Sequence, residues 1–334
     1  MKKNVLLFPS ILALSLVSCA SGIKHDISEY ILKTDYTSNY RILQLTDVHL
    51  GDKDNLDTHF KFMDLTINDA NPDFIVVTGD LFTFASKTTA KRFFDYLDSK
   101  GKPWTVTFGN HDEQCYFSVD WMTSALNNYG SHCLFKDIQD DDVQGNANFA
   151  INLMQGDAIF EQLIIMDSNR YYYGDYFGYD CFKQNQIDWY SSLVDYTKGQ
   201  NGGTVVPSLM FYHIPLPEIN NIWDPEKLEL KTGADIIVKQ ANTAQGEKAC
   251  PPDHDNGFFD VIKSKGSTTG MYFGHDHVND FIVNYQGIDF AYGVKATDRI
   301  YYGESQLGGR VITLKDDHSV EYTDFHHTYA ELEG

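Results

Sequence analysis

Three short apolar runs, separated by segments with helical spacing, constrain the fold of this chain more than any other feature. The runs are YRILQLTD at 40–47, FIVVTGD at 74–80 and PWTVTFGN at 103–110, and each is typical of a buried strand. The segments between them, 57–73 and 88–101, repeat apolar residues at helical intervals. A strand–helix–strand–helix–strand order predicts parallel pairing, with functional residues at the carboxyl ends of the strands.

The remainder of the chain continues the same domain. The segment KQNQIDWYSSLVDYTKG at 183–199 has amphipathic helical spacing, and strands are predicted again at 204–213 and 268–275. Between these strands, 214–257 is rich in Pro, Asn and Asp, which predicts a long functional loop region. No linker-like composition divides the chain, so we expect one α/β domain over residues 37–334, long enough for a large core.

The first residues have the composition of an export signal. Lys2 and Lys3 precede an apolar stretch, NVLLFPSILALSLVS, which is short for a bilayer span. In LVSCAS, a small residue precedes Cys19, as in a bacterial lipoprotein box. We therefore expect a lipoprotein signal peptide at 1–18, a membrane-anchored protein outside the cytoplasm with lipid on Cys19, and a polar tether at 19–36. The alternative is an ordinary signal peptide with a chance cysteine.

Four further cysteines remain, and outside the cytoplasm they have three possible pairings. The sequence has no C-x-x-C motif, so a cysteine-rich metal site is not expected. The pairing is left open for all four: Cys115, Cys133, Cys181 and Cys250.

Metal-binding residue types follow successive predicted strands. Taken singly, an Asp after Gly is usually a turn residue, and a His at a strand end is usually a satisfied hydrogen-bonding group. For the site to be absent, each of these residues, at one strand end after another, would need its own ordinary explanation. That coincidence is improbable. The residues are Asp47 and His49 in TDVHL, Asp80 in TGD, Asn110, His111 and Asp112 in GNHD, His213 in FYHIP, and His275 and His277 in GHDH.

The residue types suit a two-metal site. Residues two apart on an extended segment point the same way, so Asp47 with His49, and His275 with His277, are expected to reach one locus. The carboxylate of Asp80 can bridge two cations with its two oxygens. A set rich in nitrogen and oxygen but lacking Cys suits Mn, Fe, Zn or Co. Two such ions, about 3.5–4 Å apart, would clamp a phosphoryl group.

The formal net charge of −21 limits the class of partner. Binding along a nucleic-acid backbone needs a basic surface, so no nucleic-acid partner is expected. A small anionic substrate is compatible with this charge, because two bound cations would make the site itself locally positive.

In this order, the five blocks resemble the calcineurin-like metallophosphoesterases, whose pattern is D-x-H, G-D, G-N-H-[DE], H and G-H-x-H. The match spans residues 43 to 280. The resemblance implies a four-layer α/β/β/α sandwich, with mixed sheets flanked by helices. It also implies that one ion is held by Asp47, His49, Asp80 and His277, and the other by Asp80, Asn110, His213 and His275. His111 would then act beside the substrate, with Asp112 orienting it.

A narrower resemblance is to the subgroup of purple acid phosphatases that includes a yeast phosphatase and its plant relatives. The shared stretches include DFIVVTGDLF, GYDCFKQNQIDWY and FYHIPLPE. True purple enzymes carry a ligating Tyr three residues after the Gly-Asp carboxylate, whereas this chain has Thr83. We therefore expect no tyrosinate–iron chromophore.

The resemblance implies phosphoester hydrolysis, with monoesters of small molecules as the expected substrates. In this interpretation a metal-bridging hydroxide attacks phosphorus and His111 assists the leaving oxygen. Two alternatives stay open at this point. One is a phosphodiesterase acting on nucleotides or lipid head groups, and the other is a non-catalytic, metal-binding surface lipoprotein.

Overall fold

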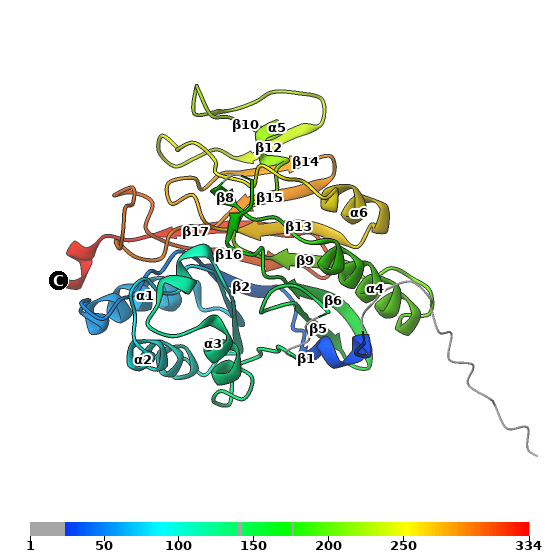
Figure 1. The fold of residues 1–334 in the computed structure, drawn as a ribbon, viewed down its shortest axis with the longest axis horizontal. Coiled ribbons are helices and arrows are strands. Elements are labelled where there is room, and N and C mark those ends of the chain that lie inside the picture. The colour runs from blue at the N-terminus through cyan, green and yellow to red at the C-terminus, as the bar shows by residue number, and fades with distance from the viewer. Residues whose placement is uncertain (1–23, 139–141, 176, 334) are drawn as a thin grey trace, which may run out of the picture.

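The structure is a computed structural model that describes residues 24–138, 142–175 and 177–333, and it contains two large sheets with helices outside them (Figure 1). The smaller sheet has the order β17-β16-β2-β3-β4. Its strands are β2 (Tyr40–Leu45), β3 (Phe74–Thr78), β4 (Trp104–Thr107), β16 (Gly308–Leu314) and β17 (Val320–His326).

The larger sheet has eight strands in the order β1-β5-β6-β9-β13-β15-β14-β12. Its strands are β1 (Ile31–Asp35), β5 (Phe149–Gln155), β6 (Ala158–Ile165), β9 (Ser208–Phe211), β12 (Ile236–Gln240), β13 (Thr268–Phe273), β14 (Ile282–Tyr285) and β15 (Ile288–Tyr292). Two small hairpins accompany it: β7 (Tyr171–Tyr173) with β8 (Phe177–Tyr179), and β10 (Trp223–Asp224) with β11 (Glu229–Leu230).

The helices α1, α2 and α3 lie together at one side of Figure 1, and α4 and α6 lie at the other. The helices are α1 (Leu56–Ala70), α2 (Lys87–Asp98), α3 (Val119–Leu126), α4 (Gln184–Gln200), α5 (Ile219–Ile222) and α6 (Phe258–Lys265), with 3-10 turns η1 (Ile27–Tyr30), η2 (Asn110–Gln114) and η3 (Tyr329–Glu333).

The predicted strand–helix–strand–helix–strand unit is confirmed. β2 pairs parallel to β3, and β3 pairs parallel to β4. Local sequence sets the helix ends, since the side chains of Asn55 and Ser86 accept hydrogen bonds from the first turns of α1 and α2. Asn71, in the left-handed region at φ 38°, ends α1 just before Pro72. The carboxyl ends of the three strands therefore meet at one edge.

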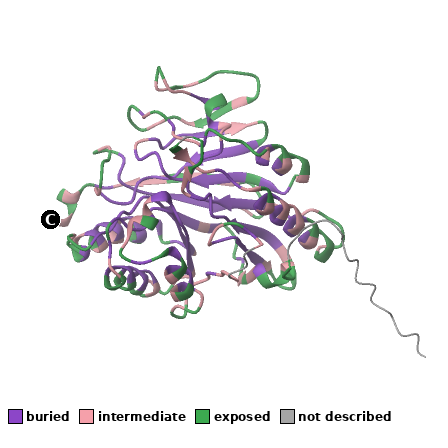
Figure 2. Cartoon of the chain, in the orientation of Figure 1, coloured by how far each residue is buried: buried purple, intermediate pink, exposed green. Residues whose placement is uncertain are grey.

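The buried apolar side chains form two cores. Figure 2 shows that buried residues run along the strands of both large sheets. Along β9, Leu209 and Phe211 belong to the core shared with the smaller sheet and α1–α3, whereas Met210 belongs to the core under α4 and α6. The second core also contains Leu193 of α4 and Ile262 of α6. This alternation, with a period of two, buries both faces of the larger sheet and confirms the four-layer sandwich.

The domain begins earlier than predicted. Residues 19–36 were expected to be a polar tether, but Ile27–Tyr30 form η1 and Ile31–Asp35 form β1, which pairs parallel to β5. The side chain of Tyr30 is buried in the second core. The predicted signal peptide at 1–18 and the lipid-bearing Cys19 lie outside the described residues, so export and anchoring stay predictions.

Two further segments differ from the sequence-based expectation. Part of the predicted long loop, 214–257, forms β12, which pairs with β14 at the edge of the larger sheet. The Tyr-rich segment after β6 forms the β7–β8 hairpin. Within the described ranges, no helix is long and apolar enough to cross a membrane. The four cysteines Cys115, Cys133, Cys181 and Cys250 are unpaired.

Candidate metal centre

The seven predicted ligands all follow strands of the two sheets and are all buried. Asp47 and His49 follow β2, Asp80 follows β3, and Asn110 opens η2, which follows β4. From the larger sheet, His213 follows β9, and His275 and His277 follow β13. Backbone hydrogen bonds tie these segments together, for example from the N–H of Gly274 to the carbonyl oxygen of His213 at 3.0 Å.

The backbone at four of these seven residues is not extended. Asp47, His49, Asp80 and His275 have φ angles of 52°, 53°, 49° and 79°, in the left-handed region that non-glycine residues rarely occupy. The expectation that residues two apart converge because their segment is extended is therefore wrong, both for Asp47 with His49 and for the segment of His275 and His277. The side chains of Asp47 and His49 nevertheless converge. Backbone strain of this kind is typical of functional sites, where the surrounding structure enforces it.

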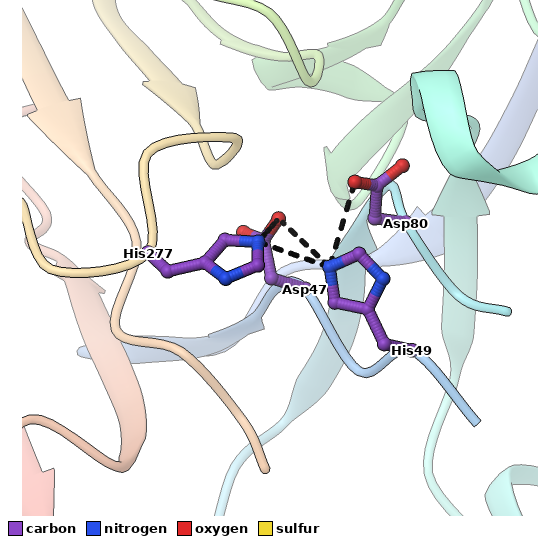
Figure 3. Close-up of side chains that lie close together, drawn as sticks. All are labelled: Asp47, His49, Asp80 and His277. Carbon is purple, nitrogen blue, oxygen red and sulfur yellow. Dashed lines mark hydrogen bonds and ion pairs between the residues drawn. The ribbon is translucent and has the colours of Figure 1, made fainter. Parts of the chain in front are cut away.

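Four of the side chains form one compact cluster, in which each contributes an atom within 4.8 Å of the others: Asp47, His49, Asp80 and His277 (Figure 3). Within it, the Nε2 atoms of His49 and His277 are 3.0 Å apart. The Oδ1 atom of Asp47 lies 3.3 Å from Nε2 of His277 and 3.8 Å from Nε2 of His49. These atoms surround one point, as the ligands of a single cation would.

Asp80 connects this cluster to the second half of the site. Its Oδ2 atom lies 3.6 Å from Nε2 of His49 and 3.3 Å from Nε2 of His213. Its other oxygen, Oδ1, accepts a hydrogen bond from the backbone N–H of His111 at 2.7 Å. Oδ2 is therefore the oxygen of Asp80 that lies between His49 and His213 without a hydrogen-bond partner among the described residues, and Asp80 would contribute to both half-sites.

Unpartnered polar atoms show that these residues fit metal ions. Buried polar atoms normally find hydrogen-bond partners, and orphaned ones require an explanation. Five buried atoms of the predicted ligands have no partner among the described residues, and they belong to both half-sites. They are Oδ1 of Asp47, Oδ2 of Asp80, Oδ1 of Asn110, Nε2 of His213 and Nε2 of His275.

Hydrogen bonds on the far side of the imidazoles fix which nitrogen faces the centre. Nδ1 of His213 lies 2.8 Å from the carbonyl oxygen of Thr78, and Nδ1 of His277 lies 2.9 Å from that of Tyr301. A carbonyl oxygen only accepts, so Nδ1 donates in both rings and Nε2 is the nitrogen that faces the centre. Nδ1 of His49 lies 2.9 Å from Oγ1 of Thr83, the residue that occupies the position of the missing tyrosine.

Glycines that precede ligands allow the chains to approach closely. A Cβ atom on Gly109 would lie 2.2 Å from Oδ1 of Asp80, and one on Gly274 would lie 2.5 Å from Oδ2 of Asp47. Both distances are far below van der Waals contact. The Gly in G-N-H and the Gly in G-H-x-H are therefore steric requirements of the centre.

Burial and nearby charge set the protonation of the imidazoles. Burial lowers the pKa of His275 to about 3, and burial together with Lys295 holds the pKa of His49 well below its ordinary value. Burial also acts on His213, but the facing carboxylate of Asp80 raises its pKa to about 10. His49 and His275 are therefore neutral, as metal ligands must be, whereas His213 holds a proton that a cation would displace.

Sequence reasoning missed Lys295, which lies behind the centre. This buried side chain donates from Nζ to the carbonyl oxygen of Asp47 at 2.7 Å, and burial lowers its pKa to about 8. It braces the left-handed backbone of Asp47 from a segment 248 residues away in the chain. No local motif surrounds it, so the sequence carries no signal for this role.

The residue that orients His111 is Gln114 and not Asp112. Nδ1 of His111 lies 2.9 Å from Oε1 of Gln114, whereas the two carboxylate oxygens of Asp112 accept from the backbone N–H groups of Phe82 and Gly109 at 3.0 and 2.8 Å. Asp112 therefore holds the loop and does not touch the ring. His111 and Gln114 are three apart in a 3-10 turn, where such side chains lie on the same face.

Comparison with known proteins shows which family this chain resembles. The model of the family described as calcineurin-like phosphoesterase matches residues 40–293. A protein of Arabidopsis thaliana named "Probable inactive purple acid phosphatase 14" is 28% identical over 90% of this chain and 81% of its own length. "Phosphatase DCR2" of Saccharomyces cerevisiae is 24% identical over 72% of this chain and 44% of its own.

Among solved structures, a dimetal phosphatase from Danio rerio superposes with a TM-score of 0.51 at 14% identity. The superposition covers 83% of this chain and 96% of that one, which supports the fold. The buried Asp–His–Asp–His cluster is suited to a dinuclear metal site. Because the family model matches well over half of its residues, the chain belongs to the calcineurin-like phosphoesterase family.

Proposed function

We propose that this protein is a phosphomonoesterase that acts on small molecules through a dinuclear metal centre. The observation that carries the proposal is the set of five buried, unpartnered ligand atoms that spans both half-sites and meets at Oδ2 of Asp80. In this proposal Mn, Fe, Zn or Co ions are held by two sets that share one residue: Asp47, His49, Asp80 and His277, and Asp80, Asn110, His213 and His275.

When bound, the ions supply Lewis-acid stabilisation of the phosphoryl charge and lower the pKa of water. The chain's own contribution to the leaving group is His111. Its Nδ1–H donates to Gln114, which directs Nε2 away from the loop, and Nε2 has no partner among the described residues. A proton carried on Nε2 can pass to the departing oxygen, as general acid catalysis requires.

Two features support catalysis rather than simple metal binding. The plant relative is named inactive, but in this chain all seven predicted ligand side chains are present and buried at the carboxyl ends of strands. His111 is also partly exposed next to the buried centre, where a substrate can reach it. A scaffold used only to bind a metal does not need a solvent-accessible imidazole hydrogen-bonded to Gln114.

The test is a panel of phosphomonoesters and matched phosphodiesters, each assayed with metal-stripped protein and added Mn, Fe, Zn or Co. The proposal expects monoester turnover that depends on metal. Faster turnover of diesters would support the phosphodiesterase alternative, and metal binding without turnover of any ester would support the non-catalytic one.

A further inference from the structure

The hydroxyl of Tyr171, on the β7–β8 hairpin, connects a proposed metal ligand with the residue that orients His111. It accepts hydrogen bonds from Nδ2 of Asn110 at 3.0 Å and from Nε2 of Gln114 at 3.4 Å. The Asn110 contact holds the amide nitrogen away from the centre, so that the orphaned Oδ1 is the atom left for a cation. Through Gln114, the same oxygen also steadies the ring of His111.

Two rings of β8 pack against Tyr171. Its ring stacks on those of Phe177 and Tyr179, with centroids 5.6 and 5.7 Å away. Tyr179 in turn packs edge-on against the ring of His275, at 4.3 Å. Asn110 and His275 belong to the same proposed half-site, so the hairpin packs directly against two of its residues.

The proton of the Tyr171 hydroxyl remains available. The oxygen accepts from two amide groups, and no described residue accepts a hydrogen bond from this hydroxyl. A phenol is both donor and acceptor, so its donor function is left for a group from outside the chain. The hydroxyl lies 3.0 Å from the amide nitrogen of Asn110, a proposed metal ligand. A ligand that accepts the proton of Tyr171 in a hydrogen bond would therefore lie next to the proposed metal centre.

We propose that Tyr171 is a further residue of the active site, which positions Asn110 and Gln114 and donates a hydrogen bond from its hydroxyl to a phosphoryl oxygen of the substrate. This inference rests on the proposed function for the identity of the ligand. The positioning role predicts an effect on one metal site, and the donor role predicts an effect on phosphate binding.

The test compares Tyr171→Phe with Tyr172→Phe, a matched control whose hydroxyl bonds Asp175 instead. In calorimetric titrations with Mn²⁺, Tyr171→Phe should weaken one of two binding events by about 10- to 100-fold and leave the other unchanged. With both sites saturated, its affinity for inorganic phosphate should fall about tenfold or more. Near-UV circular dichroism reports whether the fold is kept.

The two roles fail separately. Two unchanged metal affinities in a folded Tyr171→Phe would overturn the positioning role, and an unchanged phosphate affinity would overturn the donor role. Equal losses in Tyr172→Phe would mean that the hairpin is merely disturbed, which also overturns the inference. Failure of the proposed function is distinguishable, because these binding measurements do not need turnover.

An independent observation concerns exposed aromatic side chains. Six described aromatic residues are exposed, and all lie on segments that follow β3, β4, β6 or β15, at the edge where the proposed ligands gather. They are Phe84, Tyr116, Tyr173, Phe177, Tyr301 and Tyr302. Exposed aliphatic residues also occur elsewhere, at Ile237 and Val238 of β12, so it is the aromatic rings that gather at this edge. An exposed apolar group of this kind beside a site is typical of a binding surface.

The hairpin carries the most exposed part of this surface. Tyr173 and Phe177 are 72% and 69% exposed, with ring centroids 5.5 Å apart. Phe177 stacks on Tyr171, whose hydroxyl contacts Asn110 and also Gln114, the partner of His111. The exposed rings are therefore linked through Tyr171 to His111, the residue proposed to assist the leaving group. From this we infer that the tip binds planar aromatic leaving groups, again on the basis of the proposed function.

The test pairs benzyl phosphate with cyclohexylmethyl phosphate, whose leaving alcohols are similar in size and basicity but differ in aromaticity. The wild type should have a kcat/KM about fivefold or more higher for the benzyl ester than for the cyclohexylmethyl ester. It should also bind benzylphosphonate more tightly than cyclohexylmethylphosphonate by a similar factor. Phe177→Leu should remove both preferences, whereas Ile237→Ala, at an exposed site on β12, should keep them.

Equal kcat/KM values of the wild type for the two esters, or an unchanged preference in Phe177→Leu, would overturn this inference. Absence of turnover with both esters would count against the proposed function instead. In that case the phosphonate affinities alone would decide whether the aromatic surface binds planar rings.

Discussion

Nε2 of His49 and Nε2 of His277 face each other at 3.0 Å, although the two residues are 228 positions apart in the chain. Nδ1 of each ring is already engaged, with Thr83 and with the carbonyl oxygen of Tyr301. Two inward lone pairs at this distance repel each other unless a proton or a cation lies between them. The fold therefore brings together nitrogen atoms that a metal ion would stabilise.

Metal removal should consequently destabilise the folded protein. A ligand at a thousandfold excess over its Kd contributes about 4 kcal/mol to the free energy of unfolding. We expect chelation to lower Tm by several degrees in differential scanning calorimetry, and Mn²⁺ or Zn²⁺ to restore it. His59→Asn should keep the full chelator-dependent shift, because that histidine contacts Tyr329 and not the centre. A Tm that is indifferent to chelation would count against structural metal binding.

Metal affinity should rise with pH. Asp80 raises the pKa of His213 to about 10 in the metal-free protein, so this imidazole carries a proton at neutral pH. A cation can bind Nε2 only after that proton leaves, so lower pH opposes binding by up to about tenfold per unit below the pKa. Calorimetric metal titrations at pH 6, 7 and 8, in buffers of different ionisation enthalpy, should show that a proton is released when the ion of the His213 half-site binds. Affinity that does not change with pH would contradict this assignment.

His111→Asn should separate leaving-group assistance from metal binding. Protonation of the leaving oxygen is worth about 10²- to 10⁴-fold in rate, and a poor leaving group needs it most. We expect both ions to stay bound, with a far larger loss of kcat on alkyl phosphates than on 4-nitrophenyl phosphate. Gln114→Leu should show the same trend more weakly, because it removes the hydrogen bond to Nδ1.

Other outcomes would reassign His111. Equal losses on both substrates would mean that His111 mainly binds the phosphoryl group. Loss of an ion in His111→Asn would place it among the ligands.

Cys19→Ser tests the predicted lipid anchor. A thioether-linked lipid requires the cysteine thiol, so the serine variant should stay as unprocessed precursor or leave the membrane fraction. The measurement is partition into detergent phase, with Cys181→Ser as the control because that buried cysteine lies within the fold. Partition of Cys19→Ser equal to that of the wild type would show that another anchor exists.

The sequence was sufficient to predict the α/β architecture, and it identified the seven residues that the fold gathers. Their order carried the signal, because the carboxyl ends of neighbouring parallel strands meet at one edge. The detailed local geometry was not predictable in this way. The left-handed backbone at Asp47 and His49 depends on contacts with Lys295 and with the β3 loop.

Contacts that local sequence does not encode also explain two wrong predictions, that Asp112 orients His111 and that residues 19–36 form a tether. Asp112 and Gln114 were both within reach of His111 in sequence, and only the 3-10 turn of η2 decides between them. Ile31–Asp35 has little strand signal of its own and becomes a strand by pairing with β5, more than 100 residues later. Tyr171 likewise reaches Asn110 across 61 positions, a contact that no local pattern encodes.

The most direct test of the account is a metal titration of stripped protein, followed simultaneously by metal content and by hydrolysis of a phosphomonoester. We expect no turnover without metal and full turnover only when two ions are bound per chain. Asp80→Asn should lose more activity than substitution of any other single ligand, since one of its oxygens faces both half-sites. Full activity in the stripped protein, or no turnover with two ions bound, would contradict the central claim.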